Sequence, residues 1–348
     1  MKIAVVKSSV YQDLWVTNIS NNPYELFKTS LVRCPPIGLA EVHGADFIIV
    51  KDTNEYPCES NKNCFPEDLH ETLKFSKENK NPTLPFLDEK YHKHISIDSI
   101  AHDVDNIEWS KYNIIMCINT CVPERIIKKY PDILWCYWVG ENQYELVTNK
   151  VNCYDIILNQ DLTVYELPEF SIGFPYSYIG PKTIENLVNL DKVVKEGIFM
   201  EINNTTERPV VEIPDGFLDI SKETGHAVIR HSQDIIENAT NLSKAKYYIK
   251  LLGRKIRGNS SLECISAGTL ILADDDLIIY SDLILPECRI KSYSDAILKI
   301  KYYDANPSIY EDAIKRQRVI LDLNYFKGPY DNLVNKYNLK QTRNVINN

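Results

Sequence analysis

The stretch RGNSSLECISAGTLILADDD, residues 257–276, contains the signals of a short helix followed by a buried strand. Ser260 and Glu263 have the spacing of a capping box, in which a serine hydroxyl and a glutamate three residues later each accept from a free amide at the helix start. Gly268 is placed to end the helix, because glycine readily adopts the left-handed conformation just beyond a helix. TLILA (269–273) then continues as an apolar strand. This order predicts an α/β fold.

Cations and glycines directly precede this helix, and the start of a helix attracts anions. The backbone amides of 258–261 would point at a diphosphate, and the cations would neutralise it. Glu263, one turn further in, would repel a phosphate but could accept hydrogen bonds from ribose hydroxyls. A purely structural interpretation stays open, with a glutamate that only caps and a solvated basic turn. The candidate anion-site and ribose-site residues are Arg254, Lys255, Arg257, Gly258, Asn259, Ser260 and Glu263.

Short apolar runs, rich in β-branched residues, recur along the chain with helical or loop material between them. Such runs are typical of parallel strands covered by helices on both faces. The first series is 2–6, 46–50, 113–118, 133–138 and 154–158, and the second is 197–202, 226–230, 246–252, 269–273 and 277–280. The two series predict two Rossmann-like domains facing a cleft, where ligands bind beyond the carboxyl ends of the strands.

The glycines and prolines of 173–181 mark the expected domain boundary. We expect residues 1–178 to form an N-terminal domain with a polar, proline-bearing insertion over about 52–92. Residues 179–348 would form the C-terminal domain, closed by two helices within 307–340.

The segment SKAKYYIKLLGRKIRGNSSLECISAGTLILADDD (243–276) resembles the nucleotide-sugar-binding core of GT-B-fold glycosyltransferases. That family has Ser or Leu, then Glu-Ala-hydrophobic-Ala-hydrophobic-Gly, then an apolar strand. The matching positions are Ser261, Leu262, Glu263, Ala267, Gly268 and 269–273. The resemblance implies a GT-B-like fold and transfer of a sugar from a nucleotide-sugar to a glycan or other hydroxyl acceptor, without a metal or other cofactor. It also implies that Glu263 binds the ribose and that the N-terminal domain binds the acceptor.

The chain departs from the family at one position. Retaining members most often have a second glutamate seven or eight residues before the matched one, and Lys255 or Ile256 stands there. Retention or inversion of the sugar's configuration therefore stays open.

Two loops of the second series follow strands and offer further contacts. Thr205, Thr206 and Arg208 follow the first strand and could hold the diphosphate, or form only a polar turn before Pro209. His231 follows the next strand and could contact the base, or be structural.

An inverting transfer needs a general base within hydrogen-bond reach of the acceptor hydroxyl. Glu141 follows the strand 133–138 and so lies at its carboxyl end. His43 precedes the strand 46–50, which places it at the opposite end unless its loop is long. Both are candidates, and Glu141 has the better position.

Two other classes of function remain open. Asp103 and Asp105 form a DxD, which in GT-A-like transferases holds Mn²⁺ or Mg²⁺ against a diphosphate. A non-catalytic nucleotide- or sugar-binding protein is the second class. A Rossmann dehydrogenase is disfavoured, because no glycine follows the first strand in KIAVVKSSVYQD (2–13).

Composition limits the partners and the compartment. The net charge of -9 disfavours nucleic acid, whose phosphates need a basic surface. The nine cysteines are odd in number and several lie in apolar runs, as expected of reduced thiols in a cytoplasmic protein without a metal site. No window is long and apolar enough to predict a membrane span.

Overall fold

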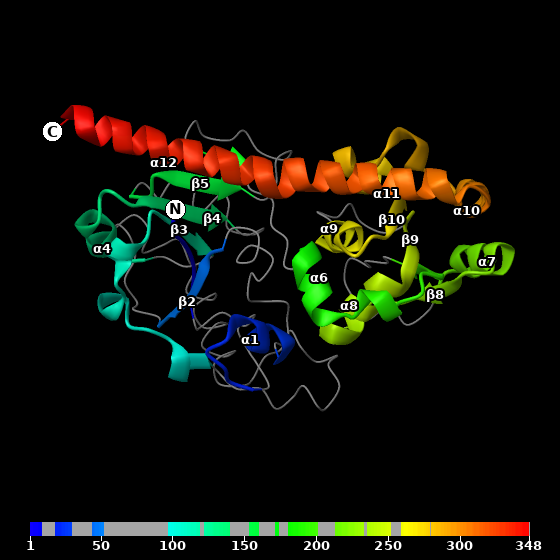
Figure 1. Cartoon of the computed structure of the whole chain (residues 1–348), viewed down its shortest axis with the longest axis horizontal. Helices are drawn as coiled ribbons and strands as arrows, with labels where there is room; N and C mark the ends of the chain where they lie inside the picture. Colours follow the sequence, from blue (N-terminus) through cyan, green and yellow to red (C-terminus); the bar gives the residue numbers. More distant parts are fainter. Residues whose placement is uncertain are drawn as a thin grey trace. The chain divides into compact units, whose positions relative to one another are not determined.

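The computed structural model describes residues 1–8, 18–29, 44–51, 97–118, 122–139, 153–159, 171–173, 180–200, 213–232, 235–251, 259–278 and 280–347. The chain divides into two compact units (Figure 1). The first consists of Met1–Tyr176 together with Phe326–Asn348, and the second is Ser177–Tyr325.

The first unit contains a parallel sheet with the strand order β2-β1-β3-β4-β5-β6. Its strands are β1 (Ile3–Ser8), β2 (Asp46–Val50), β3 (Ile114–Ile118), β4 (Leu134–Val139), β5 (Ile156–Asn159) and β6 (Ser171–Gly173). The central strands are buried on both faces, since all five residues of β3 are buried. This two-sided burial explains why the strands appear in the sequence as continuous apolar runs.

Helices cover both faces of this sheet, and alternating strand residues divide between them. Val6 and Ile115 pack in one core cluster with Ile126 of α4 (Glu124–Lys129). Ile49 packs in another with Leu26 of α1 (Pro23–Thr29). Three 3₁₀ turns precede β3 in the chain. They are Ile97–Ile100, Val104–Asn106 and Trp109–Lys111.

The last helix, α12 (Gly328–Asn347), belongs to the first unit and contacts β4 and β6. Lys340 Nζ donates to the carbonyl of Ile133 at 2.7 Å and pairs with the Asp155 carboxylate at 2.7 Å. Asn113 Nδ2 donates to Tyr337 OH at 2.9 Å. Residues 307–340 were expected in the C-terminal domain, but these polar anchors fix α12 to the first sheet.

The second unit contains a four-stranded parallel sheet with the order β10-β9-β7-β8. Its strands are β7 (Gly197–Met200), β8 (Ala227–Ile229), β9 (Ala245–Lys250) and β10 (Leu270–Ala273). The expected strand at 277–280 is wrong, because a 3₁₀ turn, Asp275–Leu277, occupies its start.

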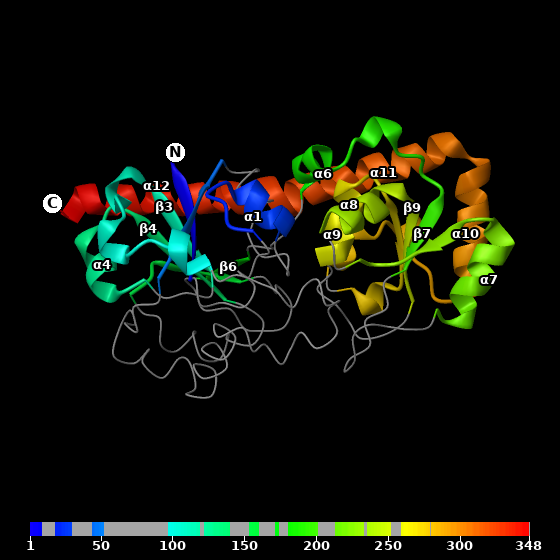
Figure 2. The same cartoon turned by 90° about the horizontal axis from the view of Figure 1, so that it is seen from below.

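Helices also cover both faces of the second sheet, as Figure 2 shows for α8 and α9 on one side and α7 and α10 on the other. They are α6 (Pro181–Leu187), α7 (Asp215–Thr224), α8 (Ile235–Lys244), α9 (Asn259–Ser266), α10 (Tyr293–Ala305) and α11 (Pro307–Leu321). Further 3₁₀ turns are Leu190–Lys192, Ser281–Leu283 and Pro286–Cys288, and a π-helical segment, Asp322–Lys327, follows α11. The expected α/β class, with two parallel-sheet units and C-terminal helices, is confirmed.

A side chain closes one edge of the second sheet. Gln317, fully buried on α11, accepts from the amide of Ile271 at 3.1 Å and donates to that residue's carbonyl at 3.3 Å and to the carbonyl of Leu283 at 3.1 Å. Its amide group thus takes the place of another strand beside β10, whose backbone groups would otherwise be buried without partners.

Within the described ranges, every helix is too short or too polar to cross a bilayer.

Candidate functional site

The helix α9 connects two neighbouring parallel strands, so its direction is fixed by the topology. β9 ends at Lys250, α9 begins at Asn259, and β10 returns to pair with β9 from Leu270. The start of α9 therefore lies on the side of the carboxyl edge of the sheet, where parallel α/β sheets bind ligands. This is the edge at which the sequence analysis places an anion site.

The end of α9 has the expected glycine stop. Gly268 has a φ of +74°, and its amide bonds the carbonyl of Ile265 at 2.9 Å. The amide of Thr269 bonds the carbonyl of Cys264 at 2.9 Å. These two bonds form a Schellman motif, which confirms the predicted role of Gly268.

Two cationic side chains that the sequence analysis did not identify hold the same helix end. Lys195 Nζ donates to the carbonyls of Ala267 (2.9 Å), Ser243 (3.0 Å) and Ala245 (3.1 Å), with Thr269 Oγ1 at 3.3 Å. Arg318 of α11 donates to the carbonyls of Ile265 and Ser266, both at 3.4 Å. Burial lowers the pKa of Lys195 to about 8. Positive charge at this end complements the helix dipole and fixes the orientation of α9.

The start of α9 differs from the predicted capping box. The helix begins at Asn259, so Ser260 already lies in its first turn and cannot be the residue that caps it. Ser260 is half-buried, and Ser261 is fully buried. With the helix starting at Asn259, Glu263 lies in the second turn, beyond the N3 position that the glutamate of a capping box occupies.

Glu263, the predicted ribose ligand, is a fully buried residue in the second turn of α9. A ribose could reach its carboxylate only after neighbouring groups move. Lys250, at the carboxyl end of β9, is also fully buried, and the sequence analysis did not select it. Burying a charged side chain costs free energy unless a partner group compensates for the lost hydration. Charged residues are therefore buried mainly where the fold or a bound ligand needs their charge.

His231 is exposed directly after β8, as the sequence analysis expects of a residue that could meet a base. Its ring lies edge-on to Phe199 at 6.5 Å, and Phe199 stacks on Tyr248 at 6.0 Å. The loop is tied to α8, because Asn238 Oδ1 accepts from the amide of Ser232 at 3.0 Å. Ser232 is thus tied to α8, and the His231 ring lies beside Phe199 near the carboxyl end of β7.

Several predicted site residues lie outside the described residues. They are Arg254, Lys255, Arg257, Gly258, Thr205, Thr206, Arg208, Glu141 and His43. Asn259 is placed as the first residue of α9. The roles predicted for all of these residues stay predictions.

The acidic segment after β10 is held by a lysine. Lys291 Nζ lies 2.6 Å from Asp274, 2.8 Å from Asp275 and 2.9 Å from Asp276. The hydrogen bond from Lys291 lowers the pKa of Asp275, and Arg289 lies 3.3 Å from the same carboxylate. Among the described residues these three aspartates are the one group of three or more ligand side chains close enough to hold a metal ion, and Lys291 already pairs with all three.

The DxD aspartates in the first unit are also paired with cations. Arg125 donates to both carboxylate oxygens of Asp105, and this hydrogen bonding lowers the pKa of Asp105. Lys51 lies 3.3 Å from Asp103. A metal ion held between the two aspartates would first have to displace both cations.

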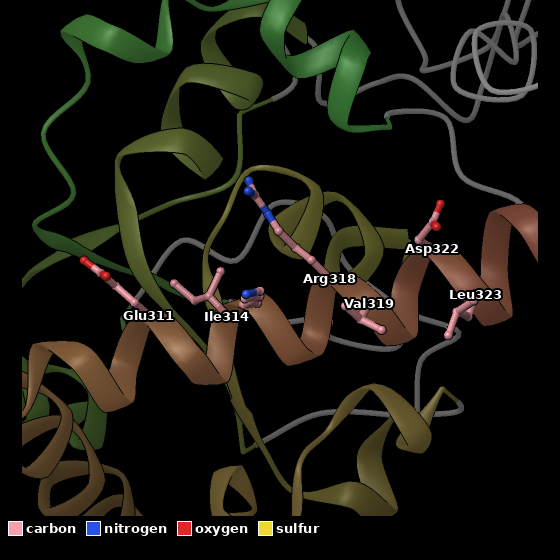
Figure 3. Close-up of a pocket in the computed structure, with 7 residues that line it drawn as sticks. Glu311, Ile314, Arg318, Val319, Asp322 and Leu323 are labelled. Atoms are coloured by element: carbon pink, nitrogen blue, oxygen red, sulfur yellow. The ribbon is translucent and has the colours of Figure 1, made fainter.

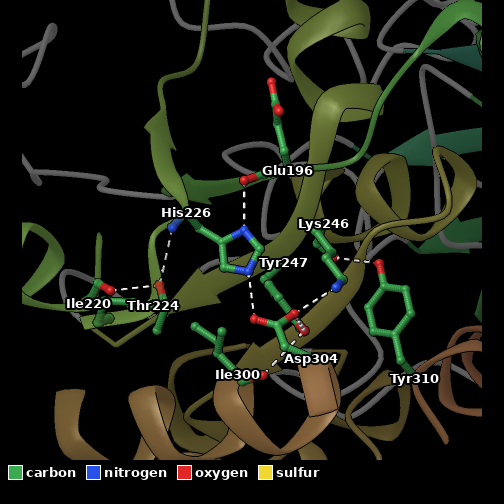
Figure 4. A network of polar contacts seen from close by, with 9 residues as sticks. All are labelled: Glu196, Ile220, Thr224, His226, Lys246, Tyr247, Ile300, Asp304 and Tyr310. Carbon is green, nitrogen blue, oxygen red and sulfur yellow. Dashed lines mark hydrogen bonds and ion pairs between the residues drawn. The ribbon is translucent and has the colours of Figure 1, made fainter. Parts of the chain in front are cut away.

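A second polar network lies at the opposite, amino edge of the second sheet (Figure 4). Asp304 accepts from Lys246 at 2.6 Å and Tyr247 at 2.8 Å, and His226 Nε2 lies 2.8 Å from its other oxygen. His226 Nδ1 contacts the carbonyl of Glu196 at 2.7 Å. The network joins α10 to the strand starts, so we assign it to the fold and not to the ligand edge.

The first unit has a pocket of about 520 Å³ beside β2. Its walls are more polar than apolar, because Asn21, Ser99 and His102 line it beside Leu26 and Ile49.

Solved structures with a similar fold include glycosyltransferases. A sucrose-phosphate synthase from Thermosynechococcus elongatus is 11% identical and matches 99% of this chain and 100% of its own, with a TM-score of 0.45. A UDP-forming trehalose-phosphate synthase from Burkholderia xenovorans is 8% identical over 97% of this chain and 99% of its own, with a TM-score of 0.47. An alpha-glucosyltransferase in complex with UDP and a 13-mer DNA is 9% identical over 97% of this chain and 99% of its own, with a TM-score of 0.48. No protein-family model matches the sequence, and no curated protein matches it in sequence.

Proposed function

We propose that this protein is a GT-B-like glycosyltransferase that moves a sugar from a nucleotide-sugar to a hydroxyl acceptor without a metal ion. The observation that carries the proposal is the position of α9, which begins at the carboxyl edge of the second sheet just after β9. Its far end is fixed by Lys195 and Arg318. A rigid helix whose free amides face a ligand edge suits a diphosphate.

The diphosphate would lie across the first turn of α9. The amides of 258–261 would bind its oxygens, and Arg254, Lys255 and Arg257 would neutralise the charge that develops as the sugar leaves. Thr205, Thr206 and Arg208 would close the other side of the phosphates. His231 would meet the base, and its exposure and its tied loop support that role.

Glu263 would bind the ribose hydroxyls, as the sequence resemblance implies. Because its side chain is fully buried here, this role requires the donor to bind with a rearrangement at the start of α9. The first unit would bind the acceptor, with the pocket beside β2 as the proposed surface and Glu141 or His43 as general base.

Independence from metal is part of the proposal. Both acidic segments considered as cation sites already pair with basic side chains, Asp103 and Asp105 with Lys51 and Arg125, and the 274–276 segment with Lys291. We expect activity to persist in EDTA, and loss of activity there would favour the DxD-based, metal-dependent alternative.

The test is a thermal-shift screen of the full chain against UDP-, GDP-, dTDP- and CMP-sugars, followed by calorimetry with the nucleotide-sugar that stabilises the protein most. We expect stabilisation by at least one of them. No shift with any of them would contradict the proposal. Binding without transfer or hydrolysis over a broad acceptor panel would instead support a non-catalytic nucleotide-sugar-binding protein.

One variant separates binding from folding. Glu263→Gln keeps the shape of the side chain, and we expect weaker donor binding with a preserved fold. If Glu263→Gln binds the donor like the wild type, the ribose role is wrong. If it unfolds, Glu263 serves the fold.

A further inference from the structure

The imidazole of His226 makes one short contact from each ring nitrogen, and both partners are hydrogen-bond acceptors (Figure 4). Nδ1 lies 2.7 Å from the backbone carbonyl oxygen of Glu196, which has no proton to give. Nε2 lies 2.8 Å from Asp304 Oδ2. A neutral imidazole carries one proton and donates only one of these bonds, whereas the imidazolium donates both.

Asp304 is held as a carboxylate, so it does not supply the second proton itself. Its other oxygen, Oδ1, accepts from Lys246 Nζ at 2.6 Å and from Tyr247 OH at 2.8 Å. Burial opposes ionisation of Asp304, but hydrogen bonds from Lys246, His226 and Tyr247 lower its pKa overall. A carbonyl on one side of the ring and a carboxylate on the other therefore require two ring protons.

The neighbouring elements direct their other charges away from the ring. The side chain of Glu196, where the chain enters β7, points away from it in Figure 4. Lys301 of α10 pairs with Glu223 of α7 at 2.9 Å. From β9, the Tyr247 ring lies edge-on to the imidazole at 5.4 Å. The carboxylate of Asp304 is thus the charge in direct contact with the imidazole.

The ammonium of Lys246 opposes a charged imidazole, but it has its own partners. It lies on the far oxygen of Asp304 and over the ring of Tyr310 on α11, 5.0 Å from the centroid. The residue after Tyr310, the exposed Glu311, lines a shallow hollow beside α11 (Figure 3).

From this count of donors and acceptors we propose that His226 is a doubly protonated clamp that joins α10 to the starts of β7 and β8 and opens when the ring releases one proton to water. Loss of either proton leaves a nitrogen lone pair facing an oxygen lone pair, so one of the two contacts breaks. The second unit therefore has a pH-sensitive joint at the amino edge of its sheet.

The sign of the pH dependence follows from proton binding. The clamp closes only with two ring protons, so the folded unit holds the second proton more tightly than the unfolded chain does. Its contribution to stability is full below about pH 6.5, where unfolded histidines are protonated, and is lost as the pH rises.

Ring-nitrogen NMR of the full chain, isotope-labelled on its histidines, tests the proton count, and His226→Gln identifies the signals. At about pH 7 we expect two protonated ring nitrogens in the wild type. In Asp304→Asn the new amide group can donate to Nε2, so we expect a neutral ring with its proton on Nδ1. Glu311→Gln, the matched exchange of a carboxylate for an amide, should leave the ring doubly protonated. A wild-type ring with one protonated nitrogen overturns the proposal.

Amide hydrogen exchange in α10 peptides tests the effect of the clamp on the fold. Wild type and His226→Gln are compared at equal pH, so intrinsic exchange rates and all titrations that the two chains share cancel. At about pH 6 the wild type should be at least about tenfold better protected. At about pH 9 the difference should fall below about threefold, because a neutral ring and a glutamine each make one bond. Equal ratios at the two pH values overturn the proposal.

Discussion

Replacing Lys195 with methionine removes the cation that joins the ends of two helices and the starts of two strands. The ammonium reaches the carbonyls of Ser243, Ala245 and Ala267 in the interior of the second unit. Methionine has nearly the same length, so the change removes the charge and the donors while keeping most of the packing.

The magnitude follows from two opposing contributions. Three charge-assisted hydrogen bonds at roughly 1.5–3 kcal/mol each amount to about 5–9 kcal/mol. Burial lowers the pKa of Lys195 from 10.5 to about 8. That decrease corresponds to roughly 3 kcal/mol against the charged form. We therefore expect Lys195→Met to lower the free energy of unfolding of the second unit by about 2–6 kcal/mol.

The assay must report on the second unit alone. All four tryptophans, at positions 15, 109, 135 and 138, belong to the first unit, so their fluorescence is uninformative here. Amide hydrogen exchange measured by mass spectrometry on peptides from β9 and β10 gives the local free energy of opening. Protection in these strands should fall at least about thirtyfold in Lys195→Met.

The control is Lys192→Met, which removes an exposed lysine three residues away. It should change protection by less than about threefold. If Lys195→Met matches this control, the buried ammonium contributes no net stability, and the reasoning about α9's fixed end is refuted.

Three further outcomes follow from the same unit. Because the folded state lowers the pKa of Lys195, the unfolded chain binds more protons between about pH 8 and 10.5, and wild-type stability should rise with pH there relative to Lys195→Met in urea titrations. Gln317→Met leaves the buried backbone groups of Ile271 without partners and should cost about 2–4 kcal/mol in the same titrations. Burial opposes ionisation of Asp304, but hydrogen bonds from Lys246 and its other partners lower its pKa overall, so the stability deficit of Asp304→Asn at neutral pH should shrink as the pH falls below about 4.

The strands could be predicted well because their information is local. DFIIV coincides with β2 (Asp46–Val50), and TLILA contains β10 (Leu270–Ala273). β6 (Ser171–Gly173) escaped prediction because three residues are too few to form a pattern, and its pairing with β5 depends on residues distant in sequence. The predicted strand at 277–280 failed for the opposite reason, since a short apolar run alone does not distinguish a strand from a 3₁₀ turn.

The site residues likewise divide into those that local sequence predicts and those that depend on distant parts of the chain. Gly268 could be predicted because its positive φ is a local need of the helix end. Lys195 and Gln317 could not, because their hydrogen-bond partners come from elements far along the chain. Lys250 looks in the sequence like the polar end of a strand, and only the packed sheet reveals its complete burial.

The most direct test of the account is calorimetric binding of the best nucleotide-sugar to Ser260→Asp. Ser260 lies in the first turn of α9, where a carboxylate favours the helix by about 0.3–1 kcal/mol but would repel a bound diphosphate. The account predicts donor affinity at least about tenfold below the wild-type value, with a melting temperature equal or higher. Unchanged affinity in Ser260→Asp would mean that no diphosphate lies at the start of α9, and would contradict the proposed function at its central point.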